Sequence, residues 1–259
     1  MARTMTFYDL HDALAMAGCP VCRLVARAVE RYVGALLWEM VNDPESRRDI
    51  RQAHGFCSNH AWALVRDGPS LGAVIIMHDV MQHTLRATRM LQGGPQPRSI
   101  AARLYSQLRG QTHSTGDMAV GSGHLEPRSR CPACGQAEIA EEMCVSILLD
   151  HLVGDDGLLA RYQASEGLCL PHFRQVLGRT TDAPAIDSLV QAQQVIWTRL
   201  VDHLGECIRK CDYRFSDEPR GDERGACARA IAALVGPRPG HSDKEANPVG
   251  FPIRERATN

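Results

Sequence analysis

The chain has 259 residues, of which 44% are hydrophobic but only 5% aromatic, and its formal net charge at neutral pH is −1. These values permit a substantial apolar core and give no general attraction to nucleic acid or to anionic lipid. No apolar run approaches the roughly 18 residues of a membrane-spanning helix, so we expect no membrane segment. The first ten residues include Asp9 and show no secretory signal, and we therefore expect a cytoplasmic, reducing location.

The first third of the chain predicts helices over residues 6–16, 21–41, 44–53, 59–66 and 71–91. Between Val21 and Val41 apolar residues recur about every 3.6 positions, as in an amphipathic helix. The sequence Asn42-Asp43-Pro44 then ends this helix, because proline cannot continue it.

Residues 93–127 differ in composition, with Gly-Pro clusters near 93–97 and several glycines between 116 and 123. We interpret this stretch as a flexible linker with a short helix over residues 100–108. Between Asp79 and Asp117 the chain has five arginines and no acidic residue, which offers a nucleic-acid surface as the alternative to a solvated linker. These arginines are Arg86, Arg89, Arg98, Arg103 and Arg109.

The rest of the chain predicts a helix over residues 136–153, a short helix, and further helices over 171–177, 186–207 and 223–235. The tail, residues 236–259, contains four prolines and many polar residues, so we expect it to be disordered. No stretch alternates apolar and polar residues as a half-buried strand would. The predicted fold class is therefore all-α.

Two short motifs each occur twice, and their residue types are those of metal ligands. The pair C-P-x-C and C-x-x-H, separated by 34 residues, begins at Cys19 and again at Cys131. Three thiolates and one imidazole suit the tetrahedral coordination of Zn²⁺ and leave no position open for catalysis. We expect each C-P-x-C to form a tight knuckle that closes on the C-x-x-H following it, in the manner of a treble clef. The predicted ligands are Cys19, Cys22, Cys57 and His60 in the first site and Cys131, Cys134, Cys169 and His172 in the second.

The duplication extends beyond the ligands. Residues 19–65 align with residues 131–177 without a gap, and thirteen of these 47 positions are identical. We therefore predict two tandem pseudo-repeats, each a small helical unit held by one zinc knuckle. The expected boundaries are 1–92 for the first repeat, 93–127 for the linker, 128–214 for the second repeat and 215–259 for the C-terminal helix and tail.

The doubled motif, the helix at 71–91 and the stretch from Lys210 to Arg214, K-C-D-Y-R, followed by D-E-P, together resemble an uncharacterised bacterial family of doubled cysteine-rich helical proteins. The resemblance covers about residues 7–236. It implies the same all-α, metal-binding organisation but no activity, because that family has no established one.

Other reactive side chains have simpler explanations. His78, Asp79 and His83 share a predicted helix, and we interpret them as a polar cluster in preference to a metal centre. Cys207 and Cys211 are four residues apart on a helix, where a disulfide would be strained. We expect both to pack as small hydrophobic residues, with a redox pair as the alternative. Cys144 and Cys227 are expected to be buried similarly.

No nucleotide-binding loop, nucleophile elbow or metalloprotease motif occurs in the sequence. The favoured hypothesis is a non-enzymatic cytoplasmic protein in which two structural Zn²⁺ ions support a helical scaffold for a protein partner or for self-association. The alternatives are a thiolate-based redox or metal sensor and a nucleic-acid-binding regulator. For the metal, an iron–sulfur cluster is the alternative to zinc.

Overall fold

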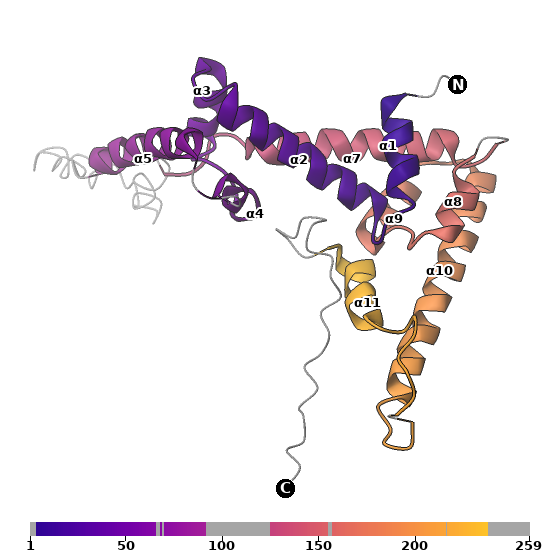
Figure 1. Cartoon of the computed structure of the whole chain (residues 1–259). Coiled ribbons are helices and arrows are strands. Elements are labelled where there is room, and N and C mark those ends of the chain that lie inside the picture. Colours follow the sequence, from indigo (N-terminus) through magenta and orange to yellow (C-terminus); the bar gives the residue numbers. More distant parts are fainter. Residues whose placement is uncertain are drawn as a thin grey trace, which may run out of the picture. The chain divides into compact units, whose positions relative to one another are not determined.

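The computed structural model describes residues 4–65, 68, 70–91, 125–154, 157–215 and 217–237. These residues form helices and connecting turns and contain no strand, which confirms the all-α prediction (Figure 1). The predicted helix at 100–108, and the tail beyond residue 237, lie outside the described residues. The elements are α1 (Met5–Ala13), α2 (Pro20–Trp38), α3 (Pro44–Gln52), α4 (Ser58–Ala61), the 3₁₀ turn η1 (Trp62–Val65), α5 (Leu71–Leu91), α7 (Pro132–His151), α8 (Leu159–Ala164), α9 (Leu170–Arg179), α10 (Ala183–Arg209) and α11 (Ala226–Val235).

The C-P-x-C motifs are helix starts, whereas the sequence predicted separate tight knuckles. Pro20 and Pro132 are the first residues of α2 and α7, so the second cysteine of each motif lies in the first helical turn. Proline suits this position because its fixed φ is helical and its missing N–H would have no partner there. The motif therefore places two thiols at a helix N-terminus.

The described chain divides into two compact units, of which the first is made of two separate segments of the sequence and the second of one. Unit 1 consists of Met1–Val29 and Ala137–Asn259, and unit 2 of Glu30–Gln136. The helices α2 and α7 each give residues to both units. Compact units and sequence repeats thus have different boundaries, and the tandem repeat itself stays a prediction.

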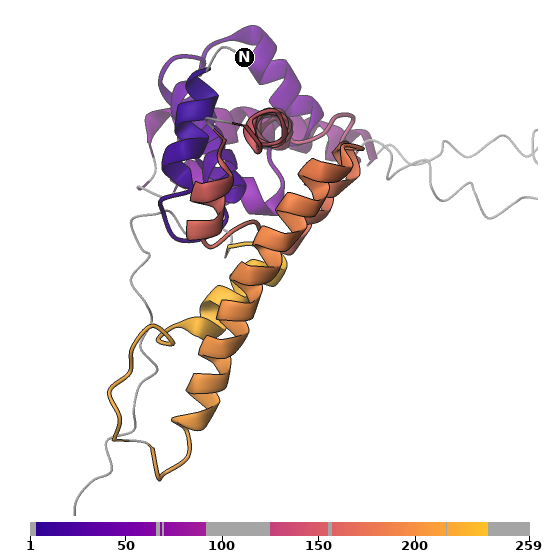
Figure 2. The same ribbon diagram turned by 90° about the vertical axis from the view of Figure 1, so that its right-hand side faces the viewer.

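Unit 1 has the larger core. Aliphatic and aromatic residues from α1, the first turns of α2, α7, α8, α9 and α10 form one buried cluster, and α10 packs against both α8 and α11. Figure 2 shows α11 beside the long helix α10. The largest fully buried side chains include Leu10, Leu148, Tyr162 and Leu189. Cys144 is buried in this core, as predicted.

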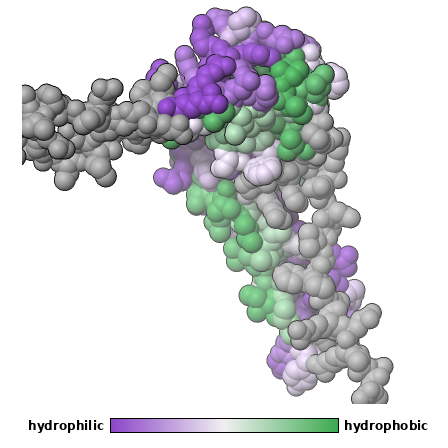
Figure 3. Space-filling view, turned by 90° about the vertical axis from the view of Figure 1, so that its left-hand side faces the viewer, coloured by the Kyte–Doolittle hydropathy of each residue, from purple (hydrophilic) through white to green (hydrophobic). Residues whose placement is uncertain are grey.

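Several hydrophobic side chains of unit 1 are nevertheless exposed. Figure 3 shows hydrophobic residues in a band that follows α10 and α11. Ile208 of α10 is 75% exposed and Val235 of α11 is 71% exposed. Cys227, at the start of α11, and Cys211 are also exposed, which corrects the prediction that both are buried.

Unit 2 has a small core where α3 and α5 pack against the last turns of α2. Leu36, Ile50, Ile76 and Val80 are buried together. The Arg51 guanidinium lies 2.7 Å from the Asp79 carboxylate, linking α3 to α5 at the edge of this core. Asp79 therefore serves in an ion pair, in agreement with its interpretation as part of a polar cluster.

Charged contacts hold the loop that follows α10. The Lys210 ammonium lies 2.9 Å from the carboxylate of Glu223, which is only 5% exposed, and also donates to the carbonyl of Pro219 at 2.7 Å. Arg209 pairs with both Glu206 and Glu218. The thiol of Cys207, half-buried, contacts the Glu223 carbonyl oxygen at 3.1 Å. The K-C-D-Y-R stretch thus begins with a lysine that holds the loop against α10.

Candidate metal centres

The eight predicted ligands lie in two groups, and in each group the four candidate ligand atoms are within 4.8 Å of one another. Centre A lies in unit 1 and centre B lies in unit 2. The structure pairs the motifs differently from the prediction, because each C-P-x-C meets the C-x-x-H of the other sequence repeat. Centre A contains Cys19, Cys22, Cys169 and His172, and centre B contains Cys57, His60, Cys131 and Cys134.

The length of α2 explains this exchange. Cys22 lies in the first turn of α2, and the helix rises by about 28 Å over its 19 residues. Ile50 of α3 packs against Leu36 near the end of α2. The following segment to Cys57 and His60 therefore starts from the end of α2 that is remote from Cys22. Helix α7 has the same effect, since Leu152, which directly follows its last residue, packs in one cluster with Leu168, just before Cys169.

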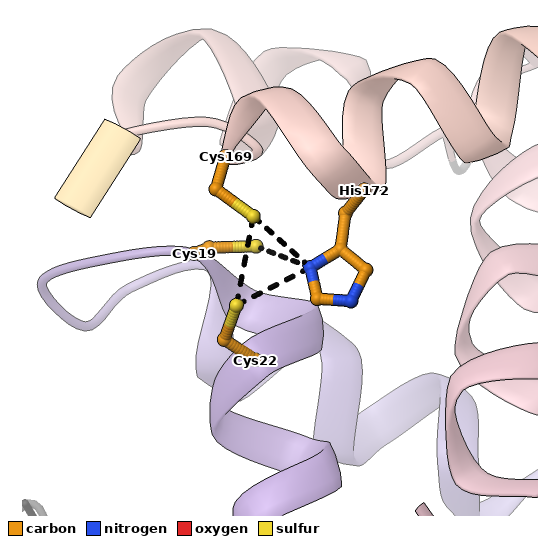
Figure 4. Close-up of side chains that lie close together, drawn as sticks. All are labelled: Cys19, Cys22, Cys169 and His172. Carbon is orange, nitrogen blue, oxygen red and sulfur yellow. Dashed lines mark hydrogen bonds between the residues drawn. The ribbon is translucent and has the colours of Figure 1, made fainter. Parts of the chain in front are cut away.

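Centre A has the dimensions of a tetrahedral site (Figure 4). The Nδ1 atom of His172 lies 3.1 Å from the sulfur of Cys169, 3.2 Å from that of Cys22 and 3.5 Å from that of Cys19. The sulfurs of Cys22 and Cys169 are 3.6 Å apart. A zinc ion about 2.3 Å from each sulfur requires sulfurs roughly 3.8 Å apart. The four ligand atoms thus fit one ion.

Centre B repeats this geometry. The Nδ1 atom of His60 lies 3.3 Å from the sulfur of Cys57, 3.4 Å from that of Cys134 and 3.7 Å from that of Cys131. The sulfurs of Cys57 and Cys134 are again 3.6 Å apart. Both centres therefore fit a soft divalent cation held by three thiolates and one Nδ1 nitrogen.

The C-x-x-H motifs adopt one conformation in both centres. Cys57 and Cys169 are the N-cap residues of α4 and α9, both extended, with ψ of 164° and 157°. Neither side chain caps its helix by a hydrogen bond, so both thiols are available as ligands. The histidine three residues later lies in the first turn on the same side, as the sequence spacing predicts.

Burial and mutual contacts shift the pKa values of the candidate ligands in both centres. Burial lowers the pKa of His172, but the neighbouring thiolates of Cys169 and Cys19 outweigh burial and raise it to about 10. The contacts with Cys19 and Cys22 lower the pKa of Cys169, whereas those with Cys169 and Cys19 raise that of Cys22. In centre B burial raises the pKa of Cys134 to about 12. A bound cation must displace these protons, so binding releases protons to solvent.

Centre A has a carboxylate partner for its histidine. The Nε2 atom of His172 lies 3.0 Å from a carboxylate oxygen of Glu141 on α7, and the His172 side chain is only 12% exposed. Such a carboxylate fixes the ring and keeps the proton on Nε2, which leaves Nδ1 free to bind the metal. In the 112-residue register the position equivalent to Glu141 is Val29, which has no such group.

We predict that Glu141→Gln lowers the zinc affinity of centre A by roughly 10–100-fold. The glutamine keeps the size of the side chain but removes the charge that orients His172. Competition with a chelator of known affinity measures the change. Glu142→Gln is the matched control, because it removes the same charge from the next residue, which pairs with Arg179 at 3.0 Å. Equal affinities for the two variants would contradict the role of Glu141.

A buried amide holds the backbone next to centre A. Gln193 of α10 is fully buried, and its side-chain oxygen accepts hydrogen bonds from the Tyr162 hydroxyl and, at 3.1 Å, from the Leu168 N–H. Its amide nitrogen donates to the Leu168 carbonyl oxygen at 3.3 Å. Gly167 has φ of +69°, and a side chain there would collide with Gln193. Both the N–H and the C=O of Leu168, the residue preceding Cys169, are thus hydrogen-bonded to Gln193.

A second contact joins the two ligand segments of centre A. The Gly18 N–H donates to the Glu166 carboxylate at 2.8 Å, one residue before Cys19. Sequence reasoning identified neither this contact nor Glu141 and Gln193, since these residues belong to no sequence motif.

The predicted cluster of His78, Asp79 and His83 is not one of the metal-ligand groups found in the described chain. Of the five arginines in the predicted strip, Arg86 and Arg89 lie on α5, and the other three lie outside the described residues.

The fold and the two centres define an all-α protein with two Cys₃His groups that could bind metal. The chain belongs to the family of unknown function DUF6062, which matches residues 1–241. This confirms the resemblance to an uncharacterised family.

The chain is also 22% identical over 196 residues to the "Uncharacterized 23.9 kDa protein in xynA 3'region" of Caldicellulosiruptor sp. (strain Rt8B.4). That alignment covers 76% of this chain and 83% of the relative. No solved structure matches the chain. Within the described residues, no helix combines the length and apolar character needed to cross a membrane.

Proposed function

We propose that this protein is a cytoplasmic zinc protein in which two structural Zn²⁺ ions hold together a helical scaffold for binding another macromolecule. The observation that supports this proposal most strongly is the distance in sequence between the ligands of each centre. Cys22 and Cys169 of centre A are separated by 147 residues, and Cys57 and Cys134 of centre B by 77 residues. One ion therefore closes a very long loop in each unit.

Closing long loops costs conformational entropy, and the cost rises with loop length. Zinc binding to structural sites supplies about 10–16 kcal/mol in small domains, enough to offset this cost. Four protein ligands also leave no coordination position for water or substrate, which favours a structural over a catalytic role. Zinc is favoured over an iron–sulfur cluster because each donor set converges on the volume of a single ion.

An apolar face on α5 supports a role in protein binding or self-association. Leu71, Val74, Met81 and Leu85 are between 51% and 76% exposed and share one side of the helix. Trp62 of η1, in the same unit, is 76% exposed. Exposed apolar surfaces of this kind are common where a protein meets a partner.

Removal of the metal tests the structural role. We expect anaerobically purified protein to contain about two zinc ions per chain, from one ion per closed centre. Stripping the metal with a chelator should lower the helical signal in circular dichroism and abolish the cooperative thermal transition, because the folding free energy of such sites comes largely from the ion. Adding zinc should restore both signals. A stripped chain that keeps its helicity and thermal midpoint would refute the proposal.

A further inference from the structure

Unit 1 contains a cavity of about 820 Å³ next to centre A. Its walls come from the segment 14–19, the segment 164–169, α10 and the region from Gly221 to α11. Cavities of this size accommodate small organic molecules. Two ligands of centre A, Cys19 and Cys169, contribute to the wall, so a bound molecule would lie beside the metal centre.

One part of the wall is apolar. It is formed by Leu14, Met16, Leu168, Ile196 and Leu200, together with several alanines. Leu14 and Ile196 are almost completely buried, at 2% and 5% exposure. This part of the cavity would contact the hydrocarbon portion of a ligand.

The remaining wall is basic, with four arginines against two carboxylates, and it also includes His203, whose Nδ1 accepts a hydrogen bond from Arg229 at 3.1 Å. One of these arginines, Arg229, and one of the carboxylates, Glu166, already make contacts within the protein. Arg229 donates to the carbonyl oxygens of Arg224 and Asp222 at 2.8 and 2.7 Å, and it lies 4.0 Å from the carboxylate of Glu166. Glu166 in turn accepts the hydrogen bond from Gly18. These contacts fix the wall and leave the other arginines available.

Three arginines remain for a ligand. Within the described part of the chain, the guanidinium groups of Arg199 and Arg224 have no carboxylate partner, and both side chains are exposed. Arg161 donates to the His11 carbonyl oxygen at 3.5 Å and has no carboxylate partner among the described residues. Asp222 is the one carboxylate left to balance three positive charges. Guanidinium groups bind carboxylates and phosphates through paired hydrogen bonds.

We propose that this cavity binds a small organic anion whose oxyanion head pairs with Arg199 and Arg224 and whose apolar body packs on Ile196 and Leu200. The shared chemistry of the head is a planar or tetrahedral oxyanion, and carboxylates and phosphate monoesters both provide it. The groups that would bind the anion, Arg199 and Arg224, are not metal ligands, but two segments of the wall carry Cys19 and Cys169 of centre A, so the test uses the zinc-loaded chain.

Isothermal titration calorimetry on the zinc-loaded full chain tests the proposal with three probes of equal chain length. Octanoate and octyl phosphate carry the two candidate heads, and octan-1-ol carries none. We expect at least one of the anions to bind in a one-to-one ratio, and octan-1-ol to bind at least about tenfold more weakly, since charge-assisted hydrogen bonds dominate. The tighter of the two anions identifies the head group. Acetate and inorganic phosphate should bind more weakly than their octyl counterparts, because they lack the apolar body.

The double variant Arg199→Gln with Arg224→Gln should weaken binding of the preferred anion at least about tenfold. Arg174→Gln is the matched control, because Arg174 is an exposed arginine of the same unit outside the cavity wall. Zinc content and circular dichroism of each variant show whether it is folded. Failure of both anions to bind, equal binding of octan-1-ol, or an equal effect of Arg174→Gln would overturn the proposal.

Discussion

The double variant Cys22→Ser with Cys169→Ser is expected to retain one zinc ion per chain, whereas Cys22→Ser with Cys57→Ser should retain none. The two variants remove the same number of thiols. In the first, both missing ligands belong to centre A, and centre B stays complete. In the second, each centre loses one ligand, and neither holds its ion against a competing chelator, because a structural site needs its full ligand set.

Metal analysis after dialysis against a chelator measures this difference directly. Cys211→Ser serves as the control and should keep both ions, because Cys211 is exposed and belongs to neither centre. If each C-P-x-C shared its ion with the C-x-x-H that follows it in the sequence, the two results would be reversed. The first variant would then retain no zinc and the second would retain one ion. The experiment thus tests the exchange of motifs between the repeats independently of any functional assay.

The exchange has a mechanical consequence for each centre. Ligands that come from one repeat would fix a short local fold, but the observed pairs connect segments from both halves of the chain. Loss of one ion should therefore loosen long-range contacts in its unit and leave individual helices to their own weak propensities. With an ion bound, each centre would act as a tertiary cross-link.

Most helices could be predicted from the sequence because apolar periodicity and proline positions define them. The helix at 71–91 has the predicted bounds, and α2 spans Pro20–Trp38 where the sequence predicted 21–41. The eight cysteine and histidine residues that the structure gathers into the two centres could also be selected from the sequence, since these residue types at these spacings have few other uses. Buried cores made of Leu, Ile and Val follow from the same periodicity.

The pairing of the ligands could not be read from the repeat. Two identical motifs at one fixed displacement support pairing within a repeat and between repeats equally well. The helical periodicity after Cys22 was the physical clue, because an uninterrupted helix of 19 residues carries the chain away from its own start. A β-hairpin in the same place would have brought the chain back to the vicinity of Cys22.

The residues that support centre A could not be predicted because their roles depend on tertiary contacts. Glu141 reads as an ordinary surface acid of a helix, and Gln193 as a polar residue within an amphipathic pattern. Only the contact between α7 and α9 shows that Glu141 orients His172, and only the contact of α10 with the segment before α9 shows that Gln193 binds the backbone before Cys169. Burial of Gln193 without these hydrogen bonds would be unfavourable.

Gly72→Ala is expected to destabilise unit 2 by about 3 kcal/mol, the upper end of the range for overpacking substitutions. A Cβ atom at Gly72, in the first turn of α5, would collide with the backbone carbonyl of Leu37 on α2. A backbone atom cannot rotate away as a side chain can, so α5 would have to shift from the core of Leu36 and Ile76. The thermal midpoint of the zinc-loaded protein should fall by several degrees.

Gly34→Ala provides the opposite result with the same chemical change. Gly34 lies within α2 in the same unit, and a Cβ atom there meets no atom within 4 Å. Alanine in a helix interior is favoured over glycine by about 0.5–1 kcal/mol, so this variant should be more stable than the natural chain. Comparison of the two midpoints separates helix propensity from packing. If both substitutions raised the midpoint, α5 could not lie directly against the Leu37 backbone, and the small core beside centre B would need a different arrangement.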